Sequence, residues 1–312
     1  MKRVLITGIA GFTGSHLGKY LCSLGLEVYG LDLSPLAAFD QILRTKIHRY
    51  YQADIRDKRK VHEIIQSVAP DYLFHLAGLV REDELQKLLE INVIGTQNIL
   101  EGLKGTKVKV LIPGSAAEYG ILPENRLPIS EDYNLNPISF YGITKLTQLK
   151  IGYHYYLQYG CAVYLPRPFN ISGPGEPPNL VCGSIAQKVV EIMRKKTEPV
   201  ITVGNLQTKR DFVDVRDVVK GYWEIVNKGT PGQVYNICSG NAYSINEVIK
   251  IFSEIAKVNL KIKQSPKLMR KIDIPIMLGD NTKIKREIGW SPKIKLEKTL
   301  ADLLNYYQKR KV

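Results

Sequence analysis

The sequence predicts an α/β fold built on a doubly wound parallel sheet, followed by a smaller mixed α/β domain. Three observations predict it. A β-branched run over 3–7 passes through a glycine-rich turn into a helical pattern closed by Gly25. Short apolar strands and helical segments then alternate as far as residue 165. After a segment rich in proline and glycine, 167–175, the pattern changes, which indicates a domain boundary.

The first turn has the form Gly-x-x-Gly-x-x-Gly, with Gly8, Gly11 and Gly14 as its glycines and Phe12 and Thr13 between the last two. Glycine permits a tight turn and lets the backbone approach a pyrophosphate, which then lies at the N-terminus of the helix. A strand, a glycine turn and a helix in this order predict a Rossmann-type dinucleotide site. A purely structural glycine turn is the alternative.

The second strand, at about 27–31, ends at Asp32. An acid at this position can accept both hydroxyls of an adenosine ribose, and it repels a 2′-phosphate. We therefore expect NAD(H) to be favoured, with NADP(H) not excluded. A capping or turn role beside Ser34 and Pro35 is the alternative.

The remaining elements follow from apolar periodicity and from breaks at glycine and proline. Strands are expected at about 47–52, 72–76, 108–112, 162–165, 200–203 and 233–237. Helices are expected up to 69 and over 85–104, 139–159, 184–195, 218–226, 244–258 and 296–309. We divide the chain into a dinucleotide-binding domain, 1–170 with 211–240 returning to it, and a substrate domain, 171–210 and 241–312.

The helix expected over 139–159 carries Tyr141 and Lys145 one turn apart on one face. A lysine ammonium near a phenol favours the phenolate, so we expect the pKa of Tyr141 to lie below its usual value of about 10. Tyr141 would then serve as a general acid/base. Ser115 follows the strand at 108–112, at the edge where doubly wound sheets bind ligands. It is placed to reach the same carbonyl as Tyr141.

Two polar residues are expected inside the protein. His75 lies in the strand at 72–76, where a buried histidine with satisfied hydrogen bonds is the better interpretation than a catalytic base. Asn92 lies in the middle of a helix, where its propensity is unfavourable, so we expect it to bond a tertiary partner.

The composition excludes several classes of function. The formal charge is +14, but the basic residues are scattered and match no nucleic-acid-binding motif, so no nucleic acid is expected. The chain has no apolar run long enough to span a bilayer. The four cysteines are widely spaced, without a metal or redox pairing, and we expect reduced thiols, no metal site and a cytoplasmic location.

Over nearly its whole length the chain resembles the extended short-chain dehydrogenase/reductase family. The resemblance is strongest to the nucleotide-sugar epimerase/dehydratase branch, and within it to enzymes that reduce GDP-4-keto-6-deoxy-mannose. The stretches that carry it, besides the glycine turn and the Tyr141/Lys145 helix, are 170–175, 203–206, 210–217, 234–240 and 279–281.

The resemblance implies a catalytic set of Ser115, Tyr141 and Lys145. It also implies a homodimer through the helices at 85–104 and 139–159. Its implied cofactor contacts are the glycine turn with Phe12 and Thr13, Asp32, Asp54, Ile55, Leu76, Ala77, Gly78, Tyr141 and Lys145.

The implied substrate is a nucleoside-diphosphate sugar, GDP-linked by preference. A diphosphate is well matched by guanidinium forks and amide donors. Arg270 lies where the family carries Arg-Pro-x-Glu, but here the sequence reads Arg-Lys-Ile-Asp. The implied substrate contacts are Ser115, Ala116, Asn170, Asn179, Arg210 and Arg270; for the last four, a surface or capping role is the alternative.

Two departures from the family decide among activities. The dehydratases place an acid where this chain has Ala117, preceded by Ala116, and neither alanine can move a proton. Reductases often carry a basic or neutral residue where this chain has Asp32, whereas epimerases usually carry the acid. We expect hydride transfer at sugar C4 by a 4-reductase of deoxysugar biosynthesis. A redox-neutral NAD-dependent epimerase is the alternative, and a non-enzymatic dinucleotide sensor is the third.

Overall fold

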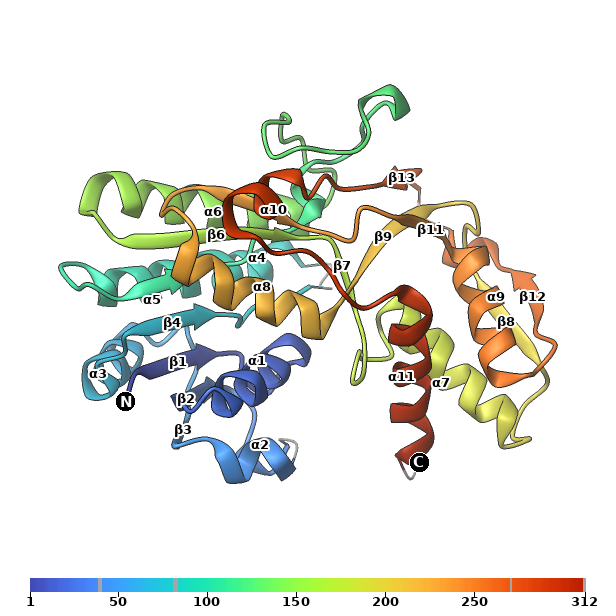
Figure 1. The fold of residues 1–312 in the computed structure, drawn as a ribbon, viewed down its shortest axis with the longest axis horizontal. Helices are drawn as coiled ribbons and strands as arrows, with labels where there is room; N and C mark the ends of the chain where they lie inside the picture. The colour runs from blue at the N-terminus through green and yellow to red at the C-terminus, as the bar shows by residue number, and fades with distance from the viewer. Residues whose placement is uncertain (39–40, 81–83, 270, 311–312) are drawn as a thin grey trace.

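The computed structural model describes residues 1–38, 41–80, 84–269 and 271–310, and it consists of two lobes side by side (Figure 1). The larger lobe contains a seven-stranded sheet in the order β10-β6-β5-β4-β1-β2-β3. All neighbouring strands in it are parallel. The strands are β1 Arg3–Thr7, β2 Glu27–Asp32, β3 Arg49–Gln52, β4 Tyr72–His75, β5 Lys109–Leu111, β6 Ala162–Pro168 and β10 Val234–Ile237. The predicted doubly wound fold is confirmed.

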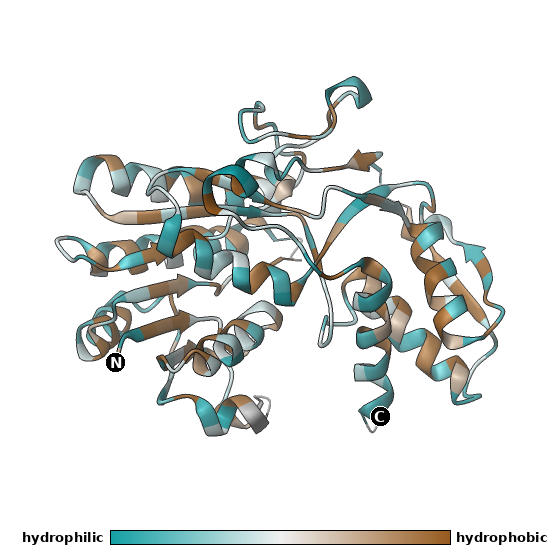
Figure 2. Ribbon diagram, in the orientation of Figure 1, coloured by the Kyte–Doolittle hydropathy of each residue, from teal (hydrophilic) through white to brown (hydrophobic). Residues whose placement is uncertain are grey.

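Helices cover both faces of this sheet, because successive side chains of each strand point to opposite sides. Val4 and Ile6 pack into the core beneath α1 (Phe12–Ser23) and α8 (Val215–Lys228). Leu5 packs into the opposite core, beneath the helices α3 Lys58–Val68, α5 Gly95–Leu103 and α6 Phe140–Tyr159. Burial on both faces explains the apolar colour of the strands in Figure 2.

The helix expected over 85–104 is divided into α4 (Leu85–Leu88), a π-helical segment η2 (Leu89–Ile94) and α5. Asn92 lies in η2, and its side chain bonds the backbone of Leu79 (2.8 and 3.0 Å) and the Thr144 hydroxyl (3.1 Å). The expected tertiary role of Asn92 is confirmed. π-Segments of this kind are frequent at functional sites, and this one lies against α6.

The smaller lobe packs three helices around one core. These are α7 Val181–Met193, α9 Ile245–Ala256 and α11 Leu296–Lys309, with a pair of parallel strands, β8 Val200–Val203 and β12 Lys261–Gln264, beside them. A second small sheet has the order β11-β9-β13, with β7 also paired to β9. Its strands are β7 Asn170–Ser172, β9 Lys209–Asp214, β11 Ala242–Ser244 and β13 Ile276–Met277.

Several elements were not expected from the sequence. They are α2 Gln41–Lys46, α10 Thr282–Ile288, the strands β7, β11, β12 and β13, and short 3-10 turns that include η3 Ala116–Glu118. Each is short, so its periodicity is weak, and β13 is formed by only two residues paired to β9. Among the described helices, none is long and apolar enough to cross a membrane.

Candidate active site

Tyr141 and Lys145 lie in the first turns of α6. The helix begins where the Ser139 side chain accepts a hydrogen bond from the Gly142 amide, at 3.1 Å. A Cβ on Gly142 would lie 2.6 Å from the Ala117 carbonyl oxygen, so only glycine lets α6 pack this closely on the loop after β5. This close packing brings Tyr141 to the loop that carries Ser115.

Ser115 lies close enough to Tyr141 for its hydroxyl to lower the pKa of the phenol. It is the N-cap of η3, and its hydroxyl oxygen accepts the Ala117 amide at 3.2 Å. Two of the three predicted catalytic side chains are therefore neighbours, and the third, Lys145, is one turn further along α6. All three lie at the carboxyl edge of the sheet, the edge at which such folds bind ligands.

The expected lowering of the Tyr141 pKa is wrong for this structure. Burial, reinforced by the Glu118 carboxylate, raises the pKa of Tyr141 to about 12, against an opposing effect of the hydrogen bond to Ser115. Burial lowers the pKa of Lys145 to about 8. The Lys145 ammonium donates a hydrogen bond to the Gln148 side chain. Desolvation of the phenol therefore decides the direction in which its pKa is shifted.

A buried polar chain continues from Lys145 into the sheet. The Gln148 amide donates to the Thr96 hydroxyl at 2.7 Å, and Thr96 lies 3.0 Å from His75 Nε2. His75 Nδ1 lies 2.7 Å from the Thr7 hydroxyl. His75 is 1% exposed, and burial lowers its pKa to about 3. Its expected role as a buried, satisfied histidine is confirmed.

The glycine turn has the shape that a dinucleotide requires. Gly8 has φ +72°, and a Cβ there would lie 2.5 Å from the Ala77 amide nitrogen. A Cβ on Gly14 would lie 2.1 Å from the Gly8 carbonyl oxygen. Gly11 is the N-cap of α1 and has no side chain to cap the first turn, in which Phe12 and Thr13 lie. The amides at this helix start are suited to phosphate oxygens, so the turn fits a dinucleotide.

Asp32 ends β2 beside the glycine turn. One carboxylate oxygen accepts the Ala10 amide at 2.9 Å, and the other accepts the Ser34 amide at 2.9 Å. The turn role considered for this residue is thus present. The same bonds hold the carboxylate next to the turn, so the predicted ribose role is compatible with them.

The other predicted cofactor residues surround this edge. The Asp54 carboxylate pairs with Arg56 at 2.7 Å, and this pairing lowers the pKa of Asp54. Asp54 would therefore have to contact the cofactor while it is paired with Arg56. Ile55 is buried against Gly95. The predicted contacts Leu76, Ala77 and Gly78 directly follow β4, where the Ala77 amide lies 3.3 Å from the Thr7 hydroxyl.

Sequence reasoning missed Glu118. The residue follows Ala116 and Ala117, and its side chain is completely buried. Its carboxylate accepts the Ser115 amide at 2.7 Å and pairs with Arg167 at 2.8 Å. These bonds direct the acid into the protein interior, so Glu118 does not replace the acid that Ala117 lacks. The Ser-x-x-Glu spacing of 115–118 is a capping-box pattern, but it does not reveal the burial of the acid, because the partner Arg167 is 49 positions away.

The predicted substrate residues are spread over two lobes. Asn170 begins β7, and Asn179 is exposed just before α7. Arg210 in β9 donates to the Asp273 carboxylate at 2.9 Å and to the Ile274 carbonyl at 2.7 Å. Ala116 is buried in the Ser115 loop. Arg270 lies outside the described residues.

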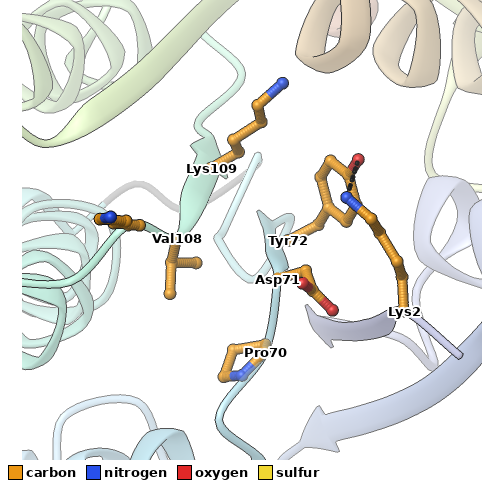
Figure 3. Close-up of a pocket in the computed structure, with 7 residues that line it drawn as sticks. Lys2, Pro70, Asp71, Tyr72, Val108 and Lys109 are labelled. Carbon is orange, nitrogen blue, oxygen red and sulfur yellow. Dashed lines mark hydrogen bonds between the residues drawn. The ribbon is translucent and has the colours of Figure 1, made fainter.

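A shallow hollow at the opposite edge of the sheet is a different feature (Figure 3). It lies where β4 and β5 begin, and it is lined by Lys2, Asp71, Tyr72, Lys107 and Lys109, among others. The Lys2 ammonium is 3.5 Å from the Tyr72 hydroxyl. This edge faces away from the carboxyl ends of the strands, so the hollow is not part of the candidate active site.

The fold and the Ser-Tyr-Lys arrangement define an enzyme of the extended short-chain dehydrogenase/reductase class. The family model described as GDP-mannose 4,6 dehydratase matches residues 5–303. The chain belongs to this family, as the resemblance in sequence predicted.

Individual relatives cover almost the entire chain. GDP-6-deoxy-D-mannose reductase of Pseudomonas aeruginosa is 31% identical over 99% of this chain and 98% of its own. UDP-glucose 4-epimerase of Bacillus subtilis is 30% identical over 96% and 95%. Among solved structures, RMD from Pseudomonas aeruginosa complexed with NADPH superposes with a TM-score of 0.87, at 28% identity and 99% coverage of both chains.

Proposed function

We propose that this protein is an NAD(P)-dependent oxidoreductase that transfers hydride at C4 of a nucleotide sugar, as a 4-reductase of the GDP-4-keto-6-deoxy-mannose type. The observation that carries the proposal is the proximity of Ser115 and Tyr141 at the carboxyl edge of the sheet, beside the glycine turn and without an acid at Ala117. The likeness to GDP-6-deoxy-D-mannose reductase supports it.

Each member of the catalytic set has a defined task in this proposal. Tyr141 donates a proton to the sugar oxygen, and its raised pKa keeps it protonated at neutral pH. Ser115 donates a hydrogen bond to the same oxygen. Lys145 leaves Gln148 to hold the nicotinamide ribose, and its charge then lowers the pKa of Tyr141. When bound, the nicotinamide supplies the hydride.

The cofactor is proposed to bind along the glycine turn, with Asp32 directed at the adenosine ribose. This carboxylate favours NAD(H), whereas the NADPH bound in the solved relative keeps NADP(H) as the competing choice. Competitive binding of NADH and NADPH, followed by fluorescence, distinguishes the two. In an Asp32→Asn variant, the affinity for NADH should fall more than the affinity for NADPH, so the preference for NADH should be lost.

The substrate is proposed to be a GDP-linked sugar held by Arg210, Asn170, Asn179 and Arg270, with Ala116 leaving room beside Ser115. A guanidinium is well matched to a diphosphate, and Arg210 already holds a carboxylate in this structure. Retention of a guanine nucleotide in purified protein, detected by mass spectrometry, would support this choice. Exclusive retention of a uridine nucleotide would contradict it.

We also propose a homodimer through η2 and α6. Both segments expose apolar side chains, including Leu89, Ile94, Ile143 and Leu157. Light scattering after gel filtration should give twice the chain mass of 35.3 kDa. The pair Ile94→Glu with Leu157→Glu should reduce it to the monomer.

The variant that tests the chemistry is Tyr141→Phe. It should lose most turnover, about 10²–10⁴-fold, because the proton donor is gone. Affinity for the cofactor should stay nearly unchanged, since the glycine turn is intact. Turnover at the wild-type level in this variant would overturn the assignment of Tyr141.

A redox-neutral 4-epimerase is the second candidate, favoured by Asp32 and by the likeness to UDP-glucose 4-epimerase. Incubation with candidate nucleotide sugars and no added cofactor separates the two. An epimerase turns over repeatedly with its bound NAD, whereas a reductase stops unless NAD(P)H is supplied in stoichiometric amount.

A further inference from the structure

The loop that carries Ser115 rests directly on the Glu118 carboxylate. One carboxylate oxygen accepts the Ser115 amide at 2.7 Å, and Ser115 in turn caps η3, so the two residues form a reciprocal capping box. A Cβ on Gly114 would lie 2.3 Å from the same carboxylate oxygen. The Glu118 side chain therefore fixes the position of the Ser115 backbone from the protein interior.

Glu118 is fixed in turn by Arg167 of β6. The Arg167 Nε donates to the second carboxylate oxygen at 2.8 Å, and the two side chains are 1% and 0% exposed. Both charges are removed from water, and apolar residues of similar volume often stabilise a fold equally well or better. Stability alone therefore does not account for a charged pair at this position. Its contacts with the catalytic loop suggest a role in turnover.

The pair also extends toward the segments at the far side of the site. Arg167 donates to the Tyr119 hydroxyl at 2.8 Å, and that hydroxyl donates to the Asn236 side chain at 2.8 Å. The Asn236 amide donates to the Ile129 carbonyl at 2.9 Å, and Ile129 bridges to Gly279. The Ser115 loop, β6, β10 and the 279–281 segment are thus joined by one buried chain of hydrogen bonds.

We propose that Glu118 and Arg167 are positioning residues for the catalytic serine: together they hold the Ser115 loop so that its hydroxyl meets Tyr141 and the sugar oxygen. The pair touches neither substrate nor cofactor and acts through Ser115. The effect of the Glu118 charge on the pKa of Tyr141 agrees with this proximity. The proposal rests on the proposed function wherever turnover is the readout.

The main test uses the double variant Glu118→Leu with Arg167→Met, which removes both charges together and so avoids leaving one buried alone. We expect a denaturation midpoint close to the wild type and a KM within threefold. We expect kcat to fall about 10- to 100-fold, as for a misplaced reacting group. Wild-type kcat in the folded double variant would overturn the proposal.

A double-mutant cycle with Ser115→Ala separates positioning from general damage. If the pair acts through Ser115, adding the double variant to Ser115→Ala should change little. The kcat of the combined variant should be less than threefold below the kcat of Ser115→Ala alone. A full additional loss in that background would contradict the proposal. Asp302→Asn breaks the partly buried pair between Asp302 of α11 and Arg216 of α8 and serves as the control, with kcat expected within twofold of wild type.

If the double variant does not fold, Glu118→Gln replaces it, because glutamine has nearly the same volume but lacks the charge that pairs with Arg167. Loss of the negative charge should lower the pKa of Tyr141. Reduction requires protonated Tyr141, so the alkaline decline of kcat should occur at a lower pH in this variant. An unchanged pH profile with unchanged kcat would contradict the proposal.

A third readout does not depend on the substrate. Hydrogen exchange of the peptide that contains the Ser115 amide should be faster in the double variant, or in Glu118→Gln, than in wild type and in Asp302→Asn. Failure of wild-type protein to turn over any nucleotide sugar would overturn the proposed function only. Unchanged exchange would overturn the positioning role.

Discussion

Two arginine–carboxylate pairs in this chain have similar geometry and different surroundings. Arg167 and Glu118 approach to 2.8 Å with 1% and 0% of their side chains exposed, whereas Arg210 and Asp273 approach to 2.9 Å with 14% and 20% exposed. The first pair is isolated from water and cannot exchange partners. The second is partly reachable from solvent, and we propose that a ligand phosphate replaces its carboxylate. If so, burial decides whether an arginine–carboxylate pair supports the fold or binds a ligand.

The largest effect is expected from breaking the buried pair on one side. Arg167→Met leaves the Glu118 carboxylate buried without its cation, which should lower the free energy of unfolding by about 3–5 kcal/mol. Urea denaturation followed by circular dichroism measures it. Arg286→Met removes an exposed pair with Glu287 and should cost at most about 1 kcal/mol. Equal losses in the two variants would contradict the expected difference between a buried and an exposed ion pair.

A third carboxylate tests the role of the cation in the buried pair. Glu176 is buried like Glu118, but its carboxylate accepts hydrogen bonds from neutral groups: the Ser172 hydroxyl at 2.6 Å and the amides of Cys182 and Gly183 at 3.1 Å. Burial raises its pKa to about 7. The folded protein then keeps a proton that the unfolded chain has lost, so stability falls as pH rises.

This loss should occur between about pH 4.5 and 7, and it should amount to at most about 3 kcal/mol. Glu176→Gln cannot ionise and should remove this part of the pH dependence. Unfolding in urea at several pH values, compared between variant and wild type, measures the difference. Parallel curves for the two proteins would contradict the raised pKa.

Removal of the partly buried Arg210 should affect binding and leave the fold intact. Arg210→Met should raise the KM for the nucleotide sugar about 10- to 100-fold, the effect of losing charged hydrogen bonds worth about 1.5–3 kcal/mol. Stability should change by about 1 kcal/mol at most. Lys209→Met, an exposed neighbour in the same strand, is the control and should leave KM within threefold. If Arg210→Met mainly lowers the free energy of unfolding, Arg210 supports the fold and does not bind the substrate.

The smallest effect is expected at Asp273. Asp273→Asn weakens the competitor for the Arg210 guanidinium, so KM should fall, by at most about fivefold for a pair worth about 0.2–1 kcal/mol. Steady-state kinetics at fixed cofactor concentration measures this change. A higher KM would mean that Asp273 orients Arg210 for the ligand instead of competing with it.

The parts of the site that could be predicted from sequence are those encoded within a few residues of each other. The glycine turn and the Tyr141/Lys145 helix, expected over 139–159 and observed over 140–159, have local patterns. The ion pair of Glu118 could not be predicted, because its partner Arg167 lies in β6, far along the chain, and only the capping-box spacing to Ser115 is local. The direction of the Tyr141 pKa was missed for the same reason, since desolvation depends on which distant segments pack around the hydroxyl.

The pairing of short strands also could not be predicted from the sequence. Strand β13 has only two residues, and its pairing with β9 places Ile274 and Asp273 against Arg210. No periodicity can be read from a strand of this length. The long helices and the buried strands, by contrast, were located to within a few residues because each has several apolar positions in phase.

We propose hydride transfer to sugar C4 with Tyr141 as proton donor. The most direct test supplies NADH or NADPH with deuterium at both positions of nicotinamide C4, together with a GDP-4-keto-6-deoxy sugar, and locates the label by NMR. We expect one deuterium at sugar C4 for each cofactor oxidised, and a rate lower by about 10²–10⁴-fold in Tyr141→Phe. Product without deuterium at C4, or product formed without oxidation of added cofactor, would contradict it.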